Sequence, residues 1–156
     1  MKKGIVILIF VAVVIGSFGS YFLIKQDFER VKEVKDIENN YDVDFEYEIE
    51  DISYSDKDVI IKGWLTEINS MNQYINRNIL LKDESGNIIS IKTESEERKD
   101  LEGKNTVETN YNKCGLIGRV NNNKLTKGEK YQVGFMIVSQ DEKENMIFTD
   151  KIIEIS

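Results

Sequence analysis

Hydrophobic residues are concentrated near the N-terminus, in an uncharged run from Gly4 to Ile24 that follows Lys2 and Lys3. An α-helix needs roughly 20 apolar residues to cross a bilayer, so the run predicts a transmembrane helix. The basic residues before it favour a cytoplasmic N-terminus and an extracytoplasmic remainder. We therefore expect residues 1–24 to form a cytoplasmic tail and a transmembrane signal-anchor helix.

A cleaved signal peptide is the alternative interpretation of this run. Its apolar stretch would end at Ile15, and the tripeptide Ser17-Phe18-Gly19 would be the cleavage site. Apolar residues continue past that site from Tyr21 to Ile24, which favours an uncleaved anchor. A buried core helix is disfavoured, because core helices rarely lack a polar face over this length.

The apolar pattern changes after the run. Among charged residues, apolar ones recur three positions apart, at Phe28, Val31, Val34 and Ile37. This spacing is typical of an amphipathic helix. We expect residues 25–41 to form a juxtamembrane stalk helix that continues the membrane helix outward.

From residue 43 the period of the pattern is two, which is typical of a half-buried strand with an acidic outer face. Further strands are predicted at residues 59–68, from 79, and at 88–93, 113–120, 131–138 and 146–155. Turn residues separate them, and residues 94–112 form a charged, irregular crossover. About seven strands at this spacing predict a mainly β fold, with residues 42–156 forming an extracytoplasmic, antiparallel Ig-like β-sandwich.

Composition restricts the chemistry of this domain. The chain has 28 acidic and 21 basic residues, so a nucleic-acid partner is disfavoured. It has no His, which removes the commonest general base and every His-ligated metal site. The single Cys, Cys114, cannot form an internal disulfide and is interpreted as a buried structural thiol. We expect no catalytic residue, cofactor or metal, and therefore no enzyme.

A few side chains are candidates for contact with a ligand or partner. Tyr74 and Tyr111 lie in loop-like segments, where an aromatic ring stacks on a ligand or acts as a packing lid. Arg98 and Asp100 lie in the crossover, where Arg98 either grips a carboxylate or phosphate or forms a structural ion pair. Trp64, the only Trp, is interpreted as a core residue rather than a sugar-binding platform.

The acidic residues suggest two further sites, neither of them favoured by spacing. Asp51, Asp56 and Asp58 offer oxygen ligands for calcium, but at a density that is more typical of a solvated turn. Paired carboxylates could hydrolyse a glycan, yet no pair stands out. A small cell-wall hydrolase is accordingly the third hypothesis for function.

Short motifs from residue 59 onward form a further pattern: Gly63-Trp64, a hairpin at Lys82–Asn87, Arg98-x-Asp100-Leu101, Tyr111, Cys114-Gly115-Leu116 and Leu125-x-x-Gly128-x-x-Tyr131-x-Val133. This pattern resembles Ig-like β-sandwich modules of membrane-anchored Gram-positive (Firmicutes) cell-envelope proteins. Such modules usually carry an aromatic residue at the position of Leu116. The resemblance implies an accessory role with no known catalytic residues.

The resulting hypothesis is a membrane-anchored, extracytoplasmic, non-enzymatic interaction module that binds another envelope protein or a surface glycan. Tyr74, Arg98, Asp100 and Tyr111 are its candidate contacts. A type IV pilin-like assembly subunit is the alternative, because such proteins also combine a basic leader ending in Gly4 with an apolar helix and a β domain. Pilins usually carry Glu at the position occupied here by Ile9, which weighs against this alternative.

Overall fold

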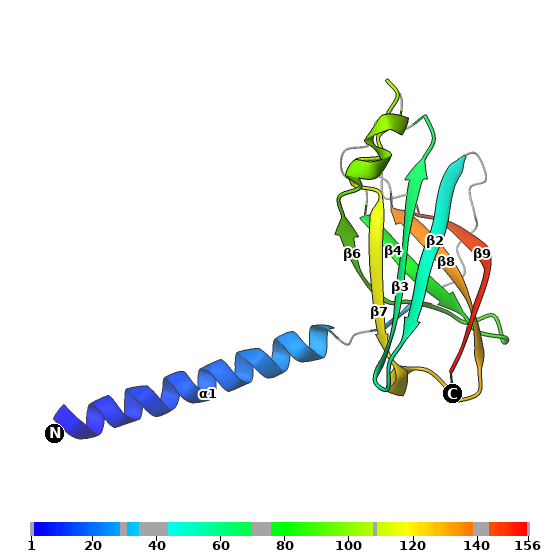
Figure 1. The fold of residues 1–156 in the computed structure, drawn as a ribbon. Coiled ribbons are helices and arrows are strands. Elements are labelled where there is room, and N and C mark those ends of the chain that lie inside the picture. Colours follow the sequence, from blue (N-terminus) through cyan, green and yellow to red (C-terminus); the bar gives the residue numbers. More distant parts are fainter. Residues whose placement is uncertain are drawn as a thin grey trace. The chain divides into compact units, whose positions relative to one another are not determined.

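The computed structural model describes residues 2–28, 31–34, 44–69, 76–107, 109–138 and 144–155. Contacts between residues divide the chain into two compact units, Met1–Arg30 and Val31–Ser156. The first unit contains helix α1, and the second contains the strands and two short 3-10 helices (Figure 1).

Helix α1 extends from Lys2 to Phe28 as one uninterrupted helix. Large apolar side chains are exposed along it: Ile9, Phe10, Val11, Val13, Val14, Ile15, Phe18, Tyr21 and Phe22. Within the part of the chain that the structure describes, no helix has the length and apolarity needed to cross a membrane. The predicted transmembrane helix over residues 1–24 is therefore not supported.

Nine strands are described in the second unit, and they form two antiparallel sheets. Their bounds are β1 Lys32–Val34, β2 Phe45–Tyr54, β3 Asp58–Glu67, β4 Asn76–Lys82, β5 Ile88–Ser90, β6 Lys92–Glu96, β7 Gly115–Asn121, β8 Lys130–Val138 and β9 Glu144–Glu154. One sheet has the strand order β1-β5-β4-β8-β9, and the other has the order β2-β3-β7-β6. The expectation of a mainly β, antiparallel fold is confirmed.

The main hydrophobic core lies between the two sheets. Alternate residues of strands from both sheets supply it with buried side chains, including Ile61, Leu65, Ile79, Leu81, Leu116, Val133, Phe135 and Ile153. The sheets therefore pack face to face, as the layers of Figure 1 also show. A second cluster, built around Leu80, Ile88, Met136 and Met146, lies on the other side of the first sheet, because these positions alternate with the core positions of the same strands.

The strand count exceeds the predicted seven for two reasons. The single strand predicted at residues 88–93 is divided at Ile91, so that β5 pairs with β4 in one sheet and β6 pairs with β7 in the other. In addition, β1 pairs with β5 where the stalk helix was expected. Both differences arise from long-range pairing rather than from the local apolar pattern.

The prediction of a stalk helix over residues 25–41 is wrong at β1, and its part from residue 35 onward lies outside the described residues. Helix α1 ends at Phe28, and the chain is extended from Lys32 to Val34. Val31 packs against the main core and Val34 against the second cluster. Ladder hydrogen bonds to β5 and these apolar contacts outweigh the helical preference of so short a segment.

Strand β2 leaves its acidic residues on the outer face of the second sheet. Phe45, Tyr47 and Ile49 pack against the main core, so the glutamates between them face outward. A register shift between Ile49 and Asp51 marks a β-bulge at Glu50. Alternation places Glu46, Glu48 and Glu50 in one row, and the bulge allows Ile52 to pack against the main core again.

A hydrogen-bonded corner precedes strand β8. The hydroxyl of Tyr131 accepts a hydrogen bond from the backbone N–H of Thr126 at 2.9 Å and donates one to Glu129 at 2.9 Å. Gly128 occupies the left-handed region at φ 79°, which few other residues tolerate. Its N–H donates to the carbonyl oxygen of Ile155 at 2.7 Å, which fixes the end of the chain against this turn.

Candidate functional site

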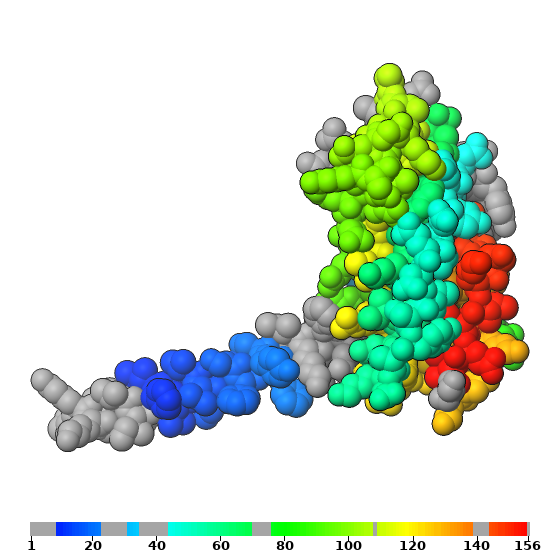
Figure 2. All heavy atoms as spheres, in the orientation of Figure 1, coloured from blue at the N-terminus to red at the C-terminus, as the bar shows by residue number. Residues whose placement is uncertain are grey.

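The segment that joins β6 to β7, called the crossover below, is described at residues 97–107 and 109–114. It contains the 3-10 helix η1, Lys99–Lys104. In Figure 2 it forms the yellow-green end of the sandwich unit, next to the cyan surface of β2. The crossover is fixed to β3 by the N–H of Leu65, which donates to the carbonyl oxygen of Cys114 at 3.0 Å.

Trp64 lies beneath the crossover. Ile61 and Leu65, three residues before Trp64 and one residue after it in β3, face the main core. Because side chains alternate along a strand, Trp64 faces the opposite side. Trp64 is only 3% exposed, and it packs with Tyr111 and Cys114 in a cluster of its own. The predicted burial of Trp64 is confirmed, but the residue that covers it belongs to the crossover and not to the facing sheet.

Arg98 forms a dense set of charged hydrogen bonds at the start of the crossover. Its Nε and Nη2 donate to the two carboxylate oxygens of Asp100 at 2.9 and 2.7 Å, and Nη2 also donates to Glu50 at 2.7 Å. These bonds lower the pKa of Asp100 and raise the pKa of Arg98 from their ordinary values. The Arg98 side chain is 11% exposed. Its guanidinium is thus engaged in a structural ion pair that connects the crossover to β2.

The absence of a side chain at Gly115 makes room for Arg98. A Cβ atom at this position would lie 2.9 Å from Cγ of Arg98 and 2.8 Å from the carbonyl oxygen of Glu96. Both distances are shorter than Cβ contacts normally allow. The Cys114-Gly115 step therefore has a packing role at the point where the crossover enters β7.

A second group of contacts surrounds the ammonium of Lys104. Its Nζ donates to Oε1 of Glu46 at 2.7 Å, while the hydroxyl of Tyr111 donates to Oε2 of the same carboxylate at 2.7 Å. The ammonium also lies 5.0 Å from the ring centre of Trp64 and 5.8 Å from that of Tyr111. The two rings meet edge to face, with centres 6.2 Å apart. We call this group of Glu46, Trp64 and Tyr111 around Lys104 the aromatic cage.

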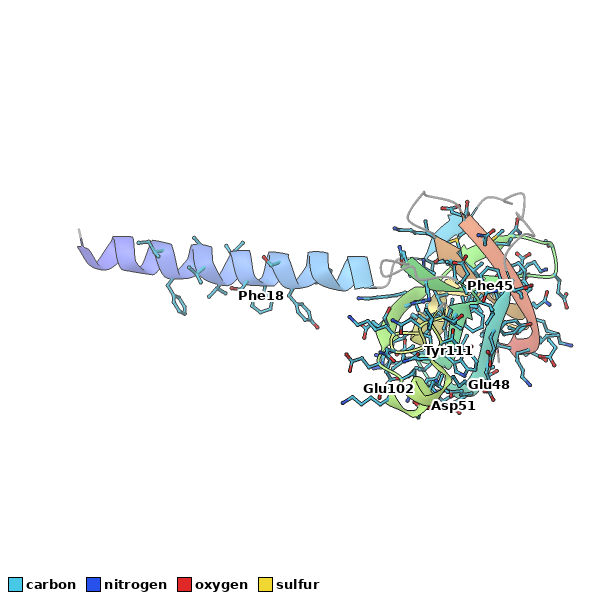
Figure 3. The ribbon with its side chains drawn as sticks, turned by 90° about the horizontal axis from the view of Figure 1, so that it is seen from above. Phe18, Phe45, Glu48, Asp51, Glu102 and Tyr111 are labelled. Atoms are coloured by element: carbon cyan, nitrogen blue, oxygen red, sulfur yellow. The ribbon has the colours of Figure 1, made fainter. Side chains whose placement is uncertain are left out.

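The charges of the cage shift its acid–base equilibria. Hydrogen bonds from Lys104 and then from Tyr111 lower the pKa of Glu46. The hydrogen bond to this carboxylate, together with burial, raises the pKa of Tyr111 to about 12. Figure 3 shows Tyr111 in the same part of the sandwich as Glu48, whose Oε2 accepts a hydrogen bond from Trp64 Nε1 at 3.3 Å. Both pKa shifts favour the carboxylate form of Glu46 and the neutral phenol of Tyr111.

Cys114 packs in the same cluster as Trp64 and Tyr111. Its side chain is fully buried, and the cysteine is free. Burial raises the pKa of the Cys114 thiol, and the charges of Arg77 and Arg98 offset this only in part. A buried thiol with a raised pKa is a poor nucleophile, so its arrangement suits packing.

The structure describes three of the four candidate contacts predicted from sequence. Arg98, Asp100 and Tyr111 all belong to the crossover, and Arg98 and Asp100 pair directly. Tyr74 lies outside the described residues. Sequence reasoning missed Glu46 and Lys104, although the alternation of β2 already placed this glutamate on the outer face.

The turn that carries the predicted calcium ligands is organised by a hydroxyl. Ser55 Oγ accepts hydrogen bonds from the N–H groups of Lys57 and Asp58 at 3.3 and 3.0 Å, as is typical of a serine turn. Asp51 lies opposite Lys62 in the ladder. Among the described residues, no three His, Cys, Asp or Glu side chains are grouped so that they could hold a metal ion.

Comparison with known proteins identified no matching family model, no similar curated protein and no similar solved structure.

Proposed function

We propose that this protein is a non-enzymatic interaction module held at the cell membrane by helix α1, with its sandwich on the extracytoplasmic side. In this proposal the sandwich binds another envelope protein or a surface glycan. The observation that carries the proposal is the exposure of apolar side chains along α1. Large exposed apolar surfaces usually mark a membrane or protein contact.

The distribution of these side chains favours a lipid environment. Residues 9–15 are consecutive apolar residues that are all exposed, so at 100° per residue they cover every side of the helix. In Figure 3 the labelled Phe18 projects outward from the helix. A helix that is apolar all round is typical of a buried or membrane environment. The uncharged sequence from Gly4 to Ile24 supports the same localisation.

The strand order supports an Ig-like classification of the sandwich. If β2 to β9 are assigned in chain order to the Ig strands A, B, C, C′, D, E, F and G, the sheets become A-B-E-D and C′-C-F-G. Tyr131 occupies the start of strand F, and its hydroxyl bonds back to the chain at Thr126. This arrangement resembles the tyrosine corner of Ig-like sandwiches, which supports the classification. Many cell-surface binding domains share this architecture, although fold alone does not define function.

The chemistry of the crossover supports a non-enzymatic role. The carboxylates of Glu46, Glu50 and Asp100 are engaged by neighbouring cations. The thiol of Cys114 is buried. Catalytic groups are expected instead to be aimed at a site where a substrate can be positioned.

Cell fractionation tests the proposed localisation. The full chain should sediment with membranes, and added protease should degrade its sandwich from the outside of intact cells. The double variant Ile15→Lys/Phe18→Lys should lose membrane association, because two charges on α1 oppose insertion into lipid. The matched control Ile152→Lys, at a side chain of β9 that is 60% exposed, should remain with the membranes. A wild-type chain that is free of membranes would refute the proposal, and recovery in filaments would favour the pilin-like alternative.

A further inference from the structure

We propose that the aromatic cage is a binding site for a primary ammonium group, and that Lys104 occupies it in the free protein. The physiological occupant that we infer is a lysine side chain of a partner protein. The identity of this partner rests on the proposed interaction function, whereas the chemistry of the cage does not.

The geometry fits an ammonium ion on three sides. Two aromatic faces lie within about 6 Å of the ammonium, the range of cation–π attraction, at 5.0 Å for Trp64 and 5.8 Å for Tyr111. Glu46 supplies the third side at 2.7 Å, and the hydroxyl of Tyr111 fixes the orientation of this carboxylate. Aromatic cages of this kind recognise organic cations when a carboxylate adds charge.

The hydrogen bond to Glu46 selects a primary ammonium. An N–H group donates to Oε1 of Glu46, and a quaternary ammonium has no N–H to donate. The ligand must also arrive on a slender aliphatic chain, because Trp64 is covered and only 3% exposed. A lysine side chain meets both conditions, as the presence of Lys104 in the cage demonstrates. The net charge of −7 adds a general attraction for basic partners.

The current occupant can leave without unfolding the sandwich. The Lys104 side chain is 48% exposed, and that of Glu46 is 40% exposed. Lys104 ends η1, a helix without buried residues, so its side chain can turn into solvent. Ion pairs with this exposure are weak. Lys104 therefore acts as an internal competitor that a partner lysine replaces.

Removing this competitor provides the test. Binding of n-butylammonium to the full chain in a neutral detergent would be followed through the fluorescence of Trp64, the only Trp. Lys104→Ala should bind up to about tenfold more tightly than the wild type, because occupation of the cage by Lys104 lowers its apparent affinity for a competing ammonium. The matched control Lys99→Ala, on the same short helix, should bind like the wild type. Adding Glu46→Gln to Lys104→Ala should remove most of the gain.

Further measurements keep the result unambiguous. Circular dichroism would verify that each variant is folded, and Lys104→Gln, which retains the stem and a polar end, would replace Lys104→Ala if the latter were unfolded. Equal affinities of Lys104→Ala and Lys99→Ala would overturn the cage. Tighter binding of tetramethylammonium than of n-butylammonium would overturn the assignment to a lysine. Neither result depends on membrane fractionation, so failure of the cage and failure of the proposed function are distinguishable.

Discussion

The hydrogen-bonded corner at Tyr131, near the start of β8, allows a direct test of how the sandwich is stabilised. Replacing Tyr131 by Phe keeps the ring, which is 5% exposed and packs in the main core. The change removes the hydroxyl and with it two hydrogen bonds, from Thr126 and to Glu129, both 2.9 Å long. Any loss of stability then reports these two bonds and not a cavity in the core.

The expected loss follows from the surroundings of the two partners. A neutral hydrogen bond contributes about 1 kcal/mol to stability, and a donor left unsatisfied in a buried place costs about 1–3 kcal/mol. Thr126 is exposed and Glu129 is half-buried, so water recovers part of this cost. We therefore expect the free energy of unfolding to fall by about 1.5 kcal/mol. For a unit of this size the midpoint of thermal unfolding should fall by about 5 °C.

Thermal unfolding monitored by circular dichroism measures this difference. Tyr54→Phe is the matched control, because the Tyr54 side chain is 55% exposed and loses the same atom. The control should change the midpoint by less than about 2 °C, as expected for a surface substitution. If Tyr131→Phe and Tyr54→Phe unfold at the same temperature, the corner does not stabilise the sandwich and the reasoning is refuted.

Two other substitutions test the crossover. Gly115→Ala should lower the free energy of unfolding by about 1–3 kcal/mol, because its Cβ would lie 2.8 Å from the carbonyl oxygen of Glu96. Gly103→Ala is the control and should leave the free energy of unfolding unchanged, because a Cβ atom there would have no neighbouring atom within 4 Å. The raised pKa of Tyr111, about 12, predicts a stabilising contribution that is complete below pH 10 and is lost as the pH rises through about 12. An ultraviolet titration of phenolate should detect this late ionisation and find it shifted towards pH 10 in Glu46→Gln; an unchanged titration would contradict the assigned hydrogen bond.

Apolar stretches bounded by turn residues were sufficient to predict most of the strands. The strands expected at residues 59–68, 113–120, 131–138 and 146–155 correspond to β3, β7, β8 and β9. Each is long enough for its buried residues to form a pattern that outweighs local preferences. β1 could not be found in this way, because three residues do not distinguish an extended segment from a helical turn.

The contacts within the candidate site were harder to predict from the sequence than the strands. The run that contains Trp64 is apolar on both faces, so its period did not indicate which side the ring occupies. The partners of the crossover are also distant in sequence, because the residue numbers of Lys104 and Glu46 differ by 58 and those of Arg98 and Glu50 by 48. Charged residues in a loop give no local sign of such pairing. Arg98 and Asp100, two residues apart, were the exception.

Strand β1 also determines how the protein would respond to mechanical load. It follows α1 closely in the chain, with Phe28 ending the helix and Lys32 beginning the strand. A pulling force on α1 therefore reaches the sandwich at β1 first. The three-residue ladder to β5 offers little resistance, and the buried residues of the main core lie on other strands, with Val31 packing at its margin. We therefore expect β1 to detach from β5 before the sandwich unfolds, which would lengthen the connection between α1 and the sandwich.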